Sequence, residues 1–523
     1  MTADLQFLHE HRLSSCLEDL RQVMRSFPDH TALVHAHGSQ SYAALEGSVE
    51  AARAWLASRG LPPSCRALLL MSNLPETIWL QLALLETGAL LALVDPKTNR
   101  EALILIGQEF APAVVLCSPE LEPRARELMS GLPPRTLLVS TAGLREAAGD
   151  ASPPARPSRV SGEGRLVYFR MDREDHWRGA VFGLEQLGRT VRQVRQLFSL
   201  SLDCAVLCQM SAAHYLALST MILPALCSGG RLLLLDRGAA EEEVLDAIAH
   251  HEPRLMVHYR RDYHRLHRAA LARREAGLPV GRVLHAVVNA DSPQLPFRAS
   301  WEELFQGHLL AGFATTFAGS FLALNLPWLE DREGFVGKAL PGVELLVLDE
   351  TGQERPVGRW GEIIFSSPGM AADFLGDRRL NPEVGEEGWL RSQQMAMMDT
   401  DGFLTLADEV FDVIWVHGFK VSPLEVEEPL RELPGVLDAA ALGAPRSTHP
   451  DQVHLYVHSA EDQEGRPAWS EEALLKTCNR LFPPYLRPTR AFLVDAIPYD
   501  DEGFKLRKEL KYRTPTADVW RTS

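Results

Sequence analysis

Residues 166–181 combine a short apolar strand, a polar loop and a second apolar segment, and read Leu-Val-Tyr-Phe-Arg-Met-Asp-Arg-Glu-Asp-His-Trp-Arg-Gly-Ala-Val. A loop in this setting binds phosphate when small residues let backbone N–H groups and hydroxyls close around the anion. Positions 170–177 instead carry bulky side chains. Their three carboxylates add repulsion of roughly 4 kcal/mol per close pair of charges at an intermediate dielectric. The segment therefore has the frame of a phosphate loop without the residues that bind phosphate.

Two cysteines and a histidine offer a second kind of chemistry. Cys204 and Cys208 precede His214 closely, so a nucleophile and a base are conceivable. The cysteines lie in or beside an apolar strand, however, and buried cysteines usually behave as small hydrophobic residues. We expect them to pack in the core.

Residues 254–274 form a strongly basic stretch in a chain whose formal net charge is −16. Its basic side chains include Arg260, Arg261, His264, Arg265, His267, Arg268, Arg273 and Arg274. A solvated helix face is the more frequent explanation of such a run. The functional alternative is a docking surface for an acidic partner at Arg260, Arg261, Arg265 and Arg268.

Composition limits the remaining classes of protein. The 523 residues are 46% hydrophobic and 23% charged, which is ordinary globular material, long enough for several cores. Seven cysteines without a C-x-x-C pair favour a reducing compartment and argue against zinc. No signal peptide or long apolar run is apparent, so we expect a cytoplasmic protein without a membrane span. The acidic balance disfavours nucleic acid as a partner.

These residues must be positioned by alternating strands and helices. We expect a helix over 41–60 and then the strand–helix rhythm of a parallel sheet, with segments at 66–71, 75–87, 90–94, 100–110 and 113–117. The rhythm continues with strands at 205–210, 231–235, 255–257 and 283–288, separated by helices at 215–228 and 240–250 and by the basic helix.

After Gly337 the pattern changes to short strands and turns, which predicts a small β-rich subdomain. A separate α+β module follows, with a helix from Pro423 that contains Pro429 and a second helix at 470–481. The predicted fold is α/β: a large N-terminal domain, 1–408, of two doubly wound subdomains plus a small β subdomain, and a small mobile α+β C-terminal domain, 409–523.

Several segments carry a resemblance to the adenylate-forming superfamily of acyl- and aryl-CoA ligases, peptide-synthetase adenylation domains and luciferases. Residues 312–317 resemble Gly-x-Gly-x-Thr-Glu, residues 388–394 resemble Gly-Trp-Tyr-Arg-Thr-Gly-Asp, and residues 498–510 resemble the final Gly-Lys-x-x-Arg segment. The turn at 289–293, Asp95-Pro96-Lys97 and residues 416–427 look most like the aryl-CoA ligase branch. The resemblance implies a ligase that forms an acyl-adenylate from ATP and passes the acyl group to CoA or a carrier protein.

Charged positions of the family motifs are changed in this chain. The resemblance places Phe317 at the Mg²⁺-ligand Glu, Gln394 at the ribose-binding Asp, Glu409 at an Arg, Phe411 at the hinge Asp and Phe504 at the catalytic Lys. A phenyl ring cannot bind a hard cation. Lys505 is one residue off the catalytic position and is expected to point elsewhere. The remaining residues of the nucleotide site, according to the resemblance, are Arg178, which stands where the family has a Lys, Thr315 and Thr316.

The resemblance also places a substrate pocket around His214, Tyr215, Ala290, Asp291 and Gly312, although plain packing explains the first two equally well. Our first interpretation is a pseudo-ligase without ATP, Mg²⁺ or CoA that serves as a binding or assembly subunit in a biosynthetic pathway. The alternatives are an active acyl/aryl-CoA or acyl-carrier-protein ligase, and a carrier-protein-dependent acyltransferase that reuses the pocket. An acyl carrier protein, another biosynthetic enzyme or a small carboxylate, acyl or aryl group is the partner that these interpretations imply.

Overall fold

The computed structural model describes residues 15–149, 164–171, 177–289, 295, 297–328, 330, 332, 334–349, 351–375, 388–409, 414–416, 419–421, 423–443, 452–461, 466–499, 505, 507 and 510. The chain divides into two compact units. The first comprises 1–290, 294–345 and 364–392, and the second comprises 291–293, 346–363 and 393–523. This division follows contacts between residues, and the predicted boundary after residue 408 stays a prediction.

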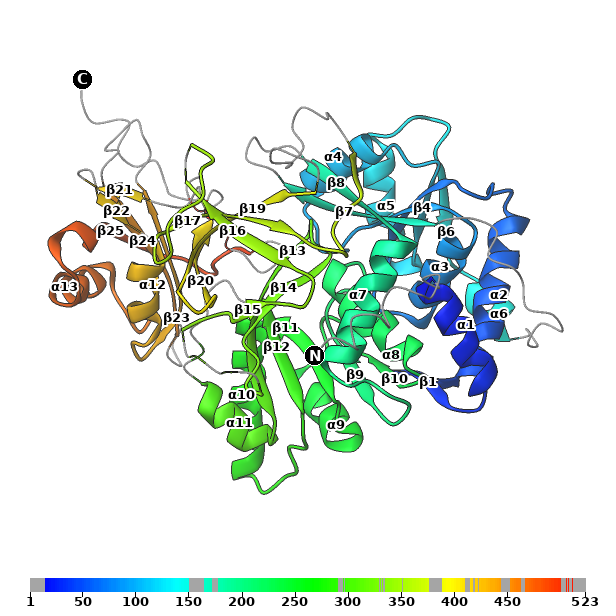
Figure 1. The fold of residues 1–523 in the computed structure, drawn as a ribbon, viewed down its shortest axis with the longest axis horizontal. Helices are drawn as coiled ribbons and strands as arrows, with labels where there is room; N and C mark the ends of the chain where they lie inside the picture. The colour runs from blue at the N-terminus through cyan, green and yellow to red at the C-terminus, as the bar shows by residue number, and fades with distance from the viewer. Residues whose placement is uncertain are drawn as a thin grey trace. The chain divides into compact units, whose positions relative to one another are not determined.

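A nine-stranded sheet forms one half of the first unit, within the described residues (Figure 1). Its strands, in spatial order, are β15 (Lys338–Ala339), β14 (Ser320–Leu324), β13 (His308–Thr315), β12 (His285–Asn289), β11 (Leu255–Tyr259), β9 (Ala205–Cys208), β10 (Arg231–Leu234), β1 (Thr31–His35) and β2 (Gly38–Ser41). The run from β13 to β1 is parallel, and antiparallel strands complete both edges. Strands such as β11 and β12 are buried along their whole length, as expected for a parallel sheet covered on both faces.

A seven-stranded sheet forms the other half of the first unit. Its strands are β18 (Asp373–Leu375), β8 (Trp177–Gly183), β7 (Arg165–Met171), β4 (Leu90–Leu93), β3 (Arg66–Leu70), β5 (Val114–Cys117) and β6 (Leu137–Ser140). The strands from β7 to β6 are parallel, whereas β8 returns antiparallel to β7. The predicted strand–loop–strand at 166–181 is therefore a β-hairpin at the antiparallel end of this sheet.

Helices cover the two sheets. They are α1 (Cys16–Ser26), α2 (Tyr42–Ser58), α3 (Pro75–Glu86), α4 (Arg100–Phe110), α5 (Glu122–Met129), α6 (Leu144–Gly149), α7 (Leu184–Leu197), α8 (Leu223–Cys227), α9 (Glu241–His251), α10 (Arg260–Glu275) and α11 (Arg298–Phe305), with short 3₁₀ and π turns at η2 (Pro119–Leu121) and η3 (Ala217–Ile222). Helix α3 is buried on every side, and Pro75 starts it where no helical N–H partner is needed. The predicted helix at 215–228 is in fact the π turn η3 followed by α8.

The remaining strands form smaller sheets. A four-stranded sheet, through which the division into units passes, contains β16 (Glu344–Leu348), β17 (Gly361–Ser366), β19 (Leu390–Met398) and β20 (Leu404–Glu409). The second unit also contains β21 (Ile414–Val416), β22 (Phe419–Val421), α12 (Pro423–Arg431), β23 (Val436–Gly443), β24 (Val453–Ser459), α13 (Glu471–Leu481), η5 (Pro484–Leu486) and β25 (Pro488–Leu493). Apolar side chains from α12, β23, β24 and α13 share one core, so the α+β module has its own hydrophobic centre.

The observed architecture confirms the predicted α/β class with doubly wound parallel cores, while the mobility of the C-terminal part stays a prediction. Pro429 lies inside α12 as expected. Within the described part of the chain, no helix combines the length and apolarity needed to cross a bilayer.

Candidate functional site

The hairpin β7–β8 places two arginines directly opposite each other. Arg170 pairs with Arg178 in the antiparallel ladder, and both side chains are buried. Cross-strand partners project from the same face of a sheet, so two cations occupy the end of the hairpin on one face. Residues 172–176, between the two strands in the sequence, lie outside the described residues.

Arg170 joins three segments that are far apart in the sequence. Its Nη1 donates a hydrogen bond of 3.0 Å to Thr315 Oγ1 on β13 and one of 3.3 Å to the Ser392 carbonyl on β19. The guanidinium also lies 5.7 Å from the centre of the Phe317 ring. These contacts connect the altered phosphate loop with the segments at 312–317 and 388–394, and all of them lie within the first unit.

Phe317 occupies the position where the resemblance expects a Mg²⁺ ligand. Its side chain is fully buried, and its ring packs edge-on against Phe374 at 5.5 Å between centroids. The Arg170 guanidinium lies 5.7 Å from the centre of this ring, and its positive charge would repel a metal cation. In the described part of the chain there is also no cluster of three or more His, Cys, Asp or Glu side chains that suits a metal. Because a phenyl ring cannot ligate Mg²⁺, Phe317 does not supply the metal ligand that the resemblance expects here.

Three buried hydroxyls surround the β13–β14 turn and the hairpin. Within the described residues, Tyr168 Oη, Thr316 Oγ1 and Ser320 Oγ have no hydrogen-bond partner. Ser320 pairs with Thr315 across β13–β14, so its side chain lies on the face that Arg170 contacts. Close packing explains why position 312 is a glycine: a Cβ there would lie 2.4 Å from a methyl carbon of Leu324.

His214 and Tyr215, the predicted pocket residues, lie together in a buried aromatic cluster. Their ring centres are 4.5 Å apart, and Tyr215 contacts Tyr168 at 6.2 Å. His214 Nε2 lies 2.9 Å from Tyr259 Oη, and its Nδ1 accepts the Leu216 N–H at 3.2 Å. Burial, with Arg237 and His258 nearby, lowers the pKa of His214 to about 3. The imidazole is therefore neutral at pH 7, with its proton on Nε2.

The cysteines pack in the core as expected. Cys208 is fully buried with its Sγ 3.5 Å from the Met210 carbonyl, and burial raises the pKa of its thiol to about 12. All seven cysteines are buried free thiols. His214 bonds to Tyr259 rather than to a cysteine, so the nucleophile–base hypothesis receives no support from the geometry.

The basic segment forms α10, and acidic side chains neutralise part of its charge. Arg273 is buried and binds Glu242 at 2.9 Å and Asp246 at 2.6 Å, both on α9. Arg265 pairs with Glu241, and Arg261 lies 3.6 Å from Asp262. Arg261, Arg265 and Arg268 are exposed, whereas Arg260 is half-buried. A docking surface is therefore limited to the exposed arginines and stays a prediction.

Gln394 and Glu409 belong to the second unit. They are register partners across β19 and β20, and the Gln394 side chain is buried. A neutral amide thus occupies the position where the resemblance expects the ribose-binding carboxylate. Ala290, Asp291, Phe411 and Phe504, the other predicted positions, lie outside the described residues.

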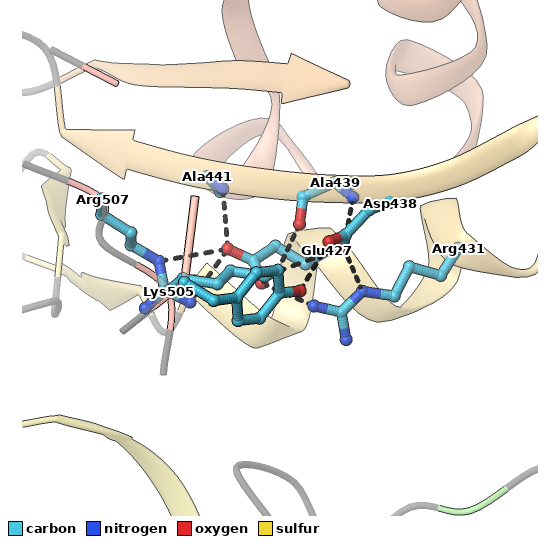
Figure 2. A network of polar contacts seen from close by, with 8 residues as sticks. Glu427, Arg431, Asp438, Ala439, Ala441, Lys505 and Arg507 are labelled. Atoms are coloured by element: carbon cyan, nitrogen blue, oxygen red, sulfur yellow. Dashed lines mark hydrogen bonds and ion pairs between the residues drawn. The ribbon is translucent and has the colours of Figure 1, made fainter. Parts of the chain in front are cut away.

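Lys505 lies in a buried ion network of the second unit, shown in Figure 2. Its Nζ donates to Glu427 and to the Ala439 carbonyl. Glu427 also accepts from Arg507 at 3.0 Å, from Arg431 at 3.3 Å and from the Ala441 N–H at 2.8 Å. The expectation that Lys505 points elsewhere than a catalytic lysine is consistent with these bonds.

Two further side chains complete this network. Arg431 binds Asp438 at 3.2 Å, and Tyr499 donates to the same carboxylate at 2.5 Å. Burial favours the protonated form of Glu427, but Arg507, Lys505 and Arg431 outweigh it and lower its pKa to about 2. Burial also lowers the pKa of Lys505, and Arg431 and Arg507 act in the same direction. The network fixes the end of the described chain to β23.

Sequence reasoning missed the roles of Arg170, Tyr259 and Glu427. Arg170 was grouped with the other bulky loop residues, although its place two residues after Tyr168 on one strand puts both on the same face. Glu427 was quoted within a motif, and its distance of 78 positions from Lys505 gave no signal of their pairing.

Comparison with known proteins finds a family model and several ligases that this chain resembles. The family model described as AMP-binding enzyme matches residues 20–167 and 178–375, and the match omits the hairpin segment 168–177. A long-chain-fatty-acid–CoA ligase of Escherichia coli O6:H1 is 29% identical over 211 residues, which are 40% of this chain and 37% of that protein. The fatty acid–[acyl-carrier-protein] ligase ScoC of Streptomyces coeruleorubidus is 30% identical over 177 residues, covering 34% and 33%.

These aligned segments span little more than a third of the curated relatives. Among solved structures, the anthranilate CoA ligase AuaEII in complex with anthranoyl-AMP superposes with a TM-score of 0.83 over 96% of this chain and 97% of that one, at 17% identity. Such a likeness shows a shared fold. Because the family model covers well over half of its residues, this chain belongs to the AMP-binding enzyme family.

Proposed function

We propose that this protein is a pseudo-ligase: it keeps the ligase fold, has lost ATP-dependent adenylation and serves as a binding or assembly subunit in a biosynthetic pathway. The proposal concerns the chemistry, since membership of the family is established by sequence.

The observation that carries the proposal is the position of the Arg170 side chain. Its guanidinium binds Thr315 and the Ser392 carbonyl and lies beside Phe317, so one side chain links the three segments that the resemblance assigns to the nucleotide. An arginine that already bonds to these groups replaces a ligand that would have to bridge them. The protein then needs no nucleotide to hold the segments together.

Two further positions support the same proposal. Phe317 supplies a buried ring at the expected cation ligand, and a buried amide, Gln394, stands at the expected ribose-binding carboxylate. Each substitution removes a charge-assisted interaction, and such interactions are about twice as strong as neutral hydrogen bonds. We therefore expect no ATP, Mg²⁺ or CoA requirement.

Isothermal titration of the full chain with ATP and Mg²⁺ tests the proposal. We expect no saturable heat, and binding followed by carboxylate-dependent pyrophosphate release would refute it. That result would favour the second candidate, an acyl/aryl-CoA or carrier-protein ligase. Two observations support this candidate: the Thr316 hydroxyl is kept and buried, and the relatives are named as ligases. ATP, Mg²⁺ and CoA would be its cofactors.

The partners implied by this role are an acyl carrier protein or another biosynthetic enzyme. The name of the Streptomyces relative, an acyl-carrier-protein ligase, supports the carrier protein. We propose a small acyl or aryl group as the ligand of the retained fold, and the predicted pocket residues His214 and Tyr215 lie in an aromatic cluster with Tyr168.

A further inference from the structure

Two histidines lie side by side where neighbouring parallel strands begin. His285 is the first residue of β12 and His308 is the first residue of β13, and the two are register partners. Register partners project from the same face of a sheet, and here their imidazoles stack, with 5.8 Å between centroids and 15° between planes. Neither residue belongs to the segments that carry the family resemblance.

Aromatic rings surround His285. The Phe198 ring lies 5.4 Å from its imidazole and the Trp328 indole lies 5.3 Å from it, between centroids. Trp328 also lies 6.3 Å from the His308 ring. His285 is only 9% exposed among these neighbours. A proton on this imidazole would therefore place a charge where little water can hydrate it.

The polar surroundings of His285 do not compensate such a charge. Within the described residues, its buried Nδ1 has no hydrogen-bond partner. The ionisable groups that act on it are all basic: His308 on β13, Arg254 directly before β11, and Arg282 shortly before β12. Burial lowers the pKa of His285 to about 4, and these three groups act in the same direction.

Two acidic side chains of neighbouring elements are bound elsewhere. Glu302 on α11 accepts from Arg298 and from the Leu309 N–H, at 3.1 Å each. Glu330, two residues after Trp328, binds Arg332 at 2.8 Å and Lys338 at 3.4 Å. Their charges are thus used in other ion pairs and do not neutralise a protonated imidazole pair.

We propose that His285 and His308 form an acid-sensitive contact, which holds β12 and β13 together at neutral pH and loosens them when the imidazoles become protonated. Neutral rings stack as largely apolar groups, whereas two protons would place like charges 5.8 Å apart among aromatic rings. The same strands end at Asn289 and Thr315, and Thr315 binds Arg170. Loosening at their first residues therefore acts on two strands that lead to the candidate site.

The direction of the pH dependence follows from proton linkage. The pKa of His285 is about 4 in the closed strand pair, compared with an ordinary value of 6.5. Between these values the open state binds a proton more readily than the closed state. The contribution of the contact is therefore complete above about pH 6.5 and is lost as the pH falls towards 4.

Hydrogen–deuterium exchange of the full chain tests the proposal, with exchange rates corrected for their intrinsic pH dependence. We expect the protection of peptides that cover β12 and β13 to fall by up to about tenfold per pH unit between roughly pH 6.5 and 5, above the range in which ordinary carboxylates titrate. Peptides that cover β24, in the second unit, should keep their protection over the same range.

Three variants separate the histidine pair from general acid sensitivity. His285→Phe keeps a ring beside Phe198 and Trp328 but cannot be protonated, so it should remove most of the pH dependence. His308→Gln should weaken the dependence, because one positive charge is lost while His285 stays buried. His250→Gln, which changes an exposed histidine of α9, is the control and should follow the wild type.

Constant protection of β12 and β13 in the wild type would overturn the proposal, and so would an equal loss in His285→Phe. If His285→Phe does not fold, the comparison rests on His308→Gln, and identical pH profiles for that variant and the wild type would overturn it. Exchange is measured without ATP or a carboxylic acid, so the result is independent of the pseudo-ligase proposal.

Discussion

The guanidinium of Arg170 donates a hydrogen bond of 3.0 Å to the hydroxyl of Thr315, joining a residue of β7 to a residue of β13 that lies 145 positions later. The two strands belong to different sheets of the first unit. Because Nη1 also binds the Ser392 carbonyl, three segments depend on one side chain. We propose that this arrangement takes the place of a bound nucleotide.

We expect Arg170→Ala to destabilise the first unit. The change removes a charged donor from the Thr315 hydroxyl and from the Ser392 carbonyl, and the loss of a hydrogen bond to a charged group costs about 1.5–3 kcal/mol. A lower midpoint in thermal or urea unfolding is the measurement. Arg189→Ala, which removes an exposed arginine paired with Glu185 on α7, should change stability by about 0.5 kcal/mol or less. Equal midpoints for both variants would contradict the linking role of Arg170.

The purified protein should release no pyrophosphate when ATP and Mg²⁺ are combined with any member of a broad panel of carboxylic acids. The reason is the joint change at Phe317 and Gln394, together with the contacts of Arg170. A coupled pyrophosphate assay makes the measurement. Acid-dependent turnover above the enzyme-free control would refute the pseudo-ligase proposal.

Phe317→Glu alone should not create adenylation activity. The new carboxylate would face the Arg170 guanidinium, which lies 5.7 Å from the present ring centre, and would form an ion pair instead of binding Mg²⁺. Groups that act as one catalytic unit are strongly non-additive, so one restored residue recovers little. Phe504→Lys should fail for the same reason. Clear adenylation by either variant would mean that an intact nucleotide site remains.

The sequence allowed the fold to be predicted well because its signal is local and repeated. Apolar runs such as those of β3 and β5, separated by helical segments, predict parallel strands covered on both faces. The strand–loop–strand order at 166–181 was also predicted, since Gly179 follows the loop and apolar residues flank it, but the antiparallel pairing of the two strands was not. Irregular elements such as η3 were not, because a π turn has no distinct pattern of its own.

For the candidate site, the sequence predicted only which charged residues of the family motifs are missing. A missing charge is visible at one position, as at Phe317, whereas a new interaction needs two positions that the fold brings together. Arg170 and Ser392 are 222 residues apart, and Glu427 and Lys505 are 78 apart, so neither pair leaves a local pattern.

Glu427→Gln should destabilise the second unit by about 3–5 kcal/mol at pH 7, because it leaves the buried Lys505 and Arg507 and the half-buried Arg431 beside a neutral amide. In the wild type, the folded pKa of Glu427 is about 2, compared with an ordinary value of 4.5. Its contribution is therefore complete above about pH 4.5 and is lost as the pH falls towards 2.

Unfolding measured from pH 7 to pH 2 checks this prediction. The stability gap between wild type and Glu427→Gln should narrow below pH 4.5, the ordinary pKa of a glutamate side chain. Glu432→Gln, at an exposed position next to the end of α12, is the control and should follow the wild type. A gap that is small at pH 7 or that stays constant with pH would contradict the role of the carboxylate.

The exposed arginines of α10 provide the last prediction, which concerns a partner protein. Charge reversal at Arg261 and Arg268 should weaken capture of the natural acidic partner in a pull-down, chiefly by slowing association, and raising the salt concentration should have the same effect on the wild type. The melting temperature should hardly change, since exposed charges contribute little to stability. Arg273→Ala is the contrasting variant: Arg273 is buried against Glu242 and Asp246, so its loss should lower the melting temperature. If the reversals leave capture unaltered, the exposed side of α10 is only a solvated face, and its arginines serve to pair with acidic residues of α9. The carrier-protein proposal then loses its support from this surface.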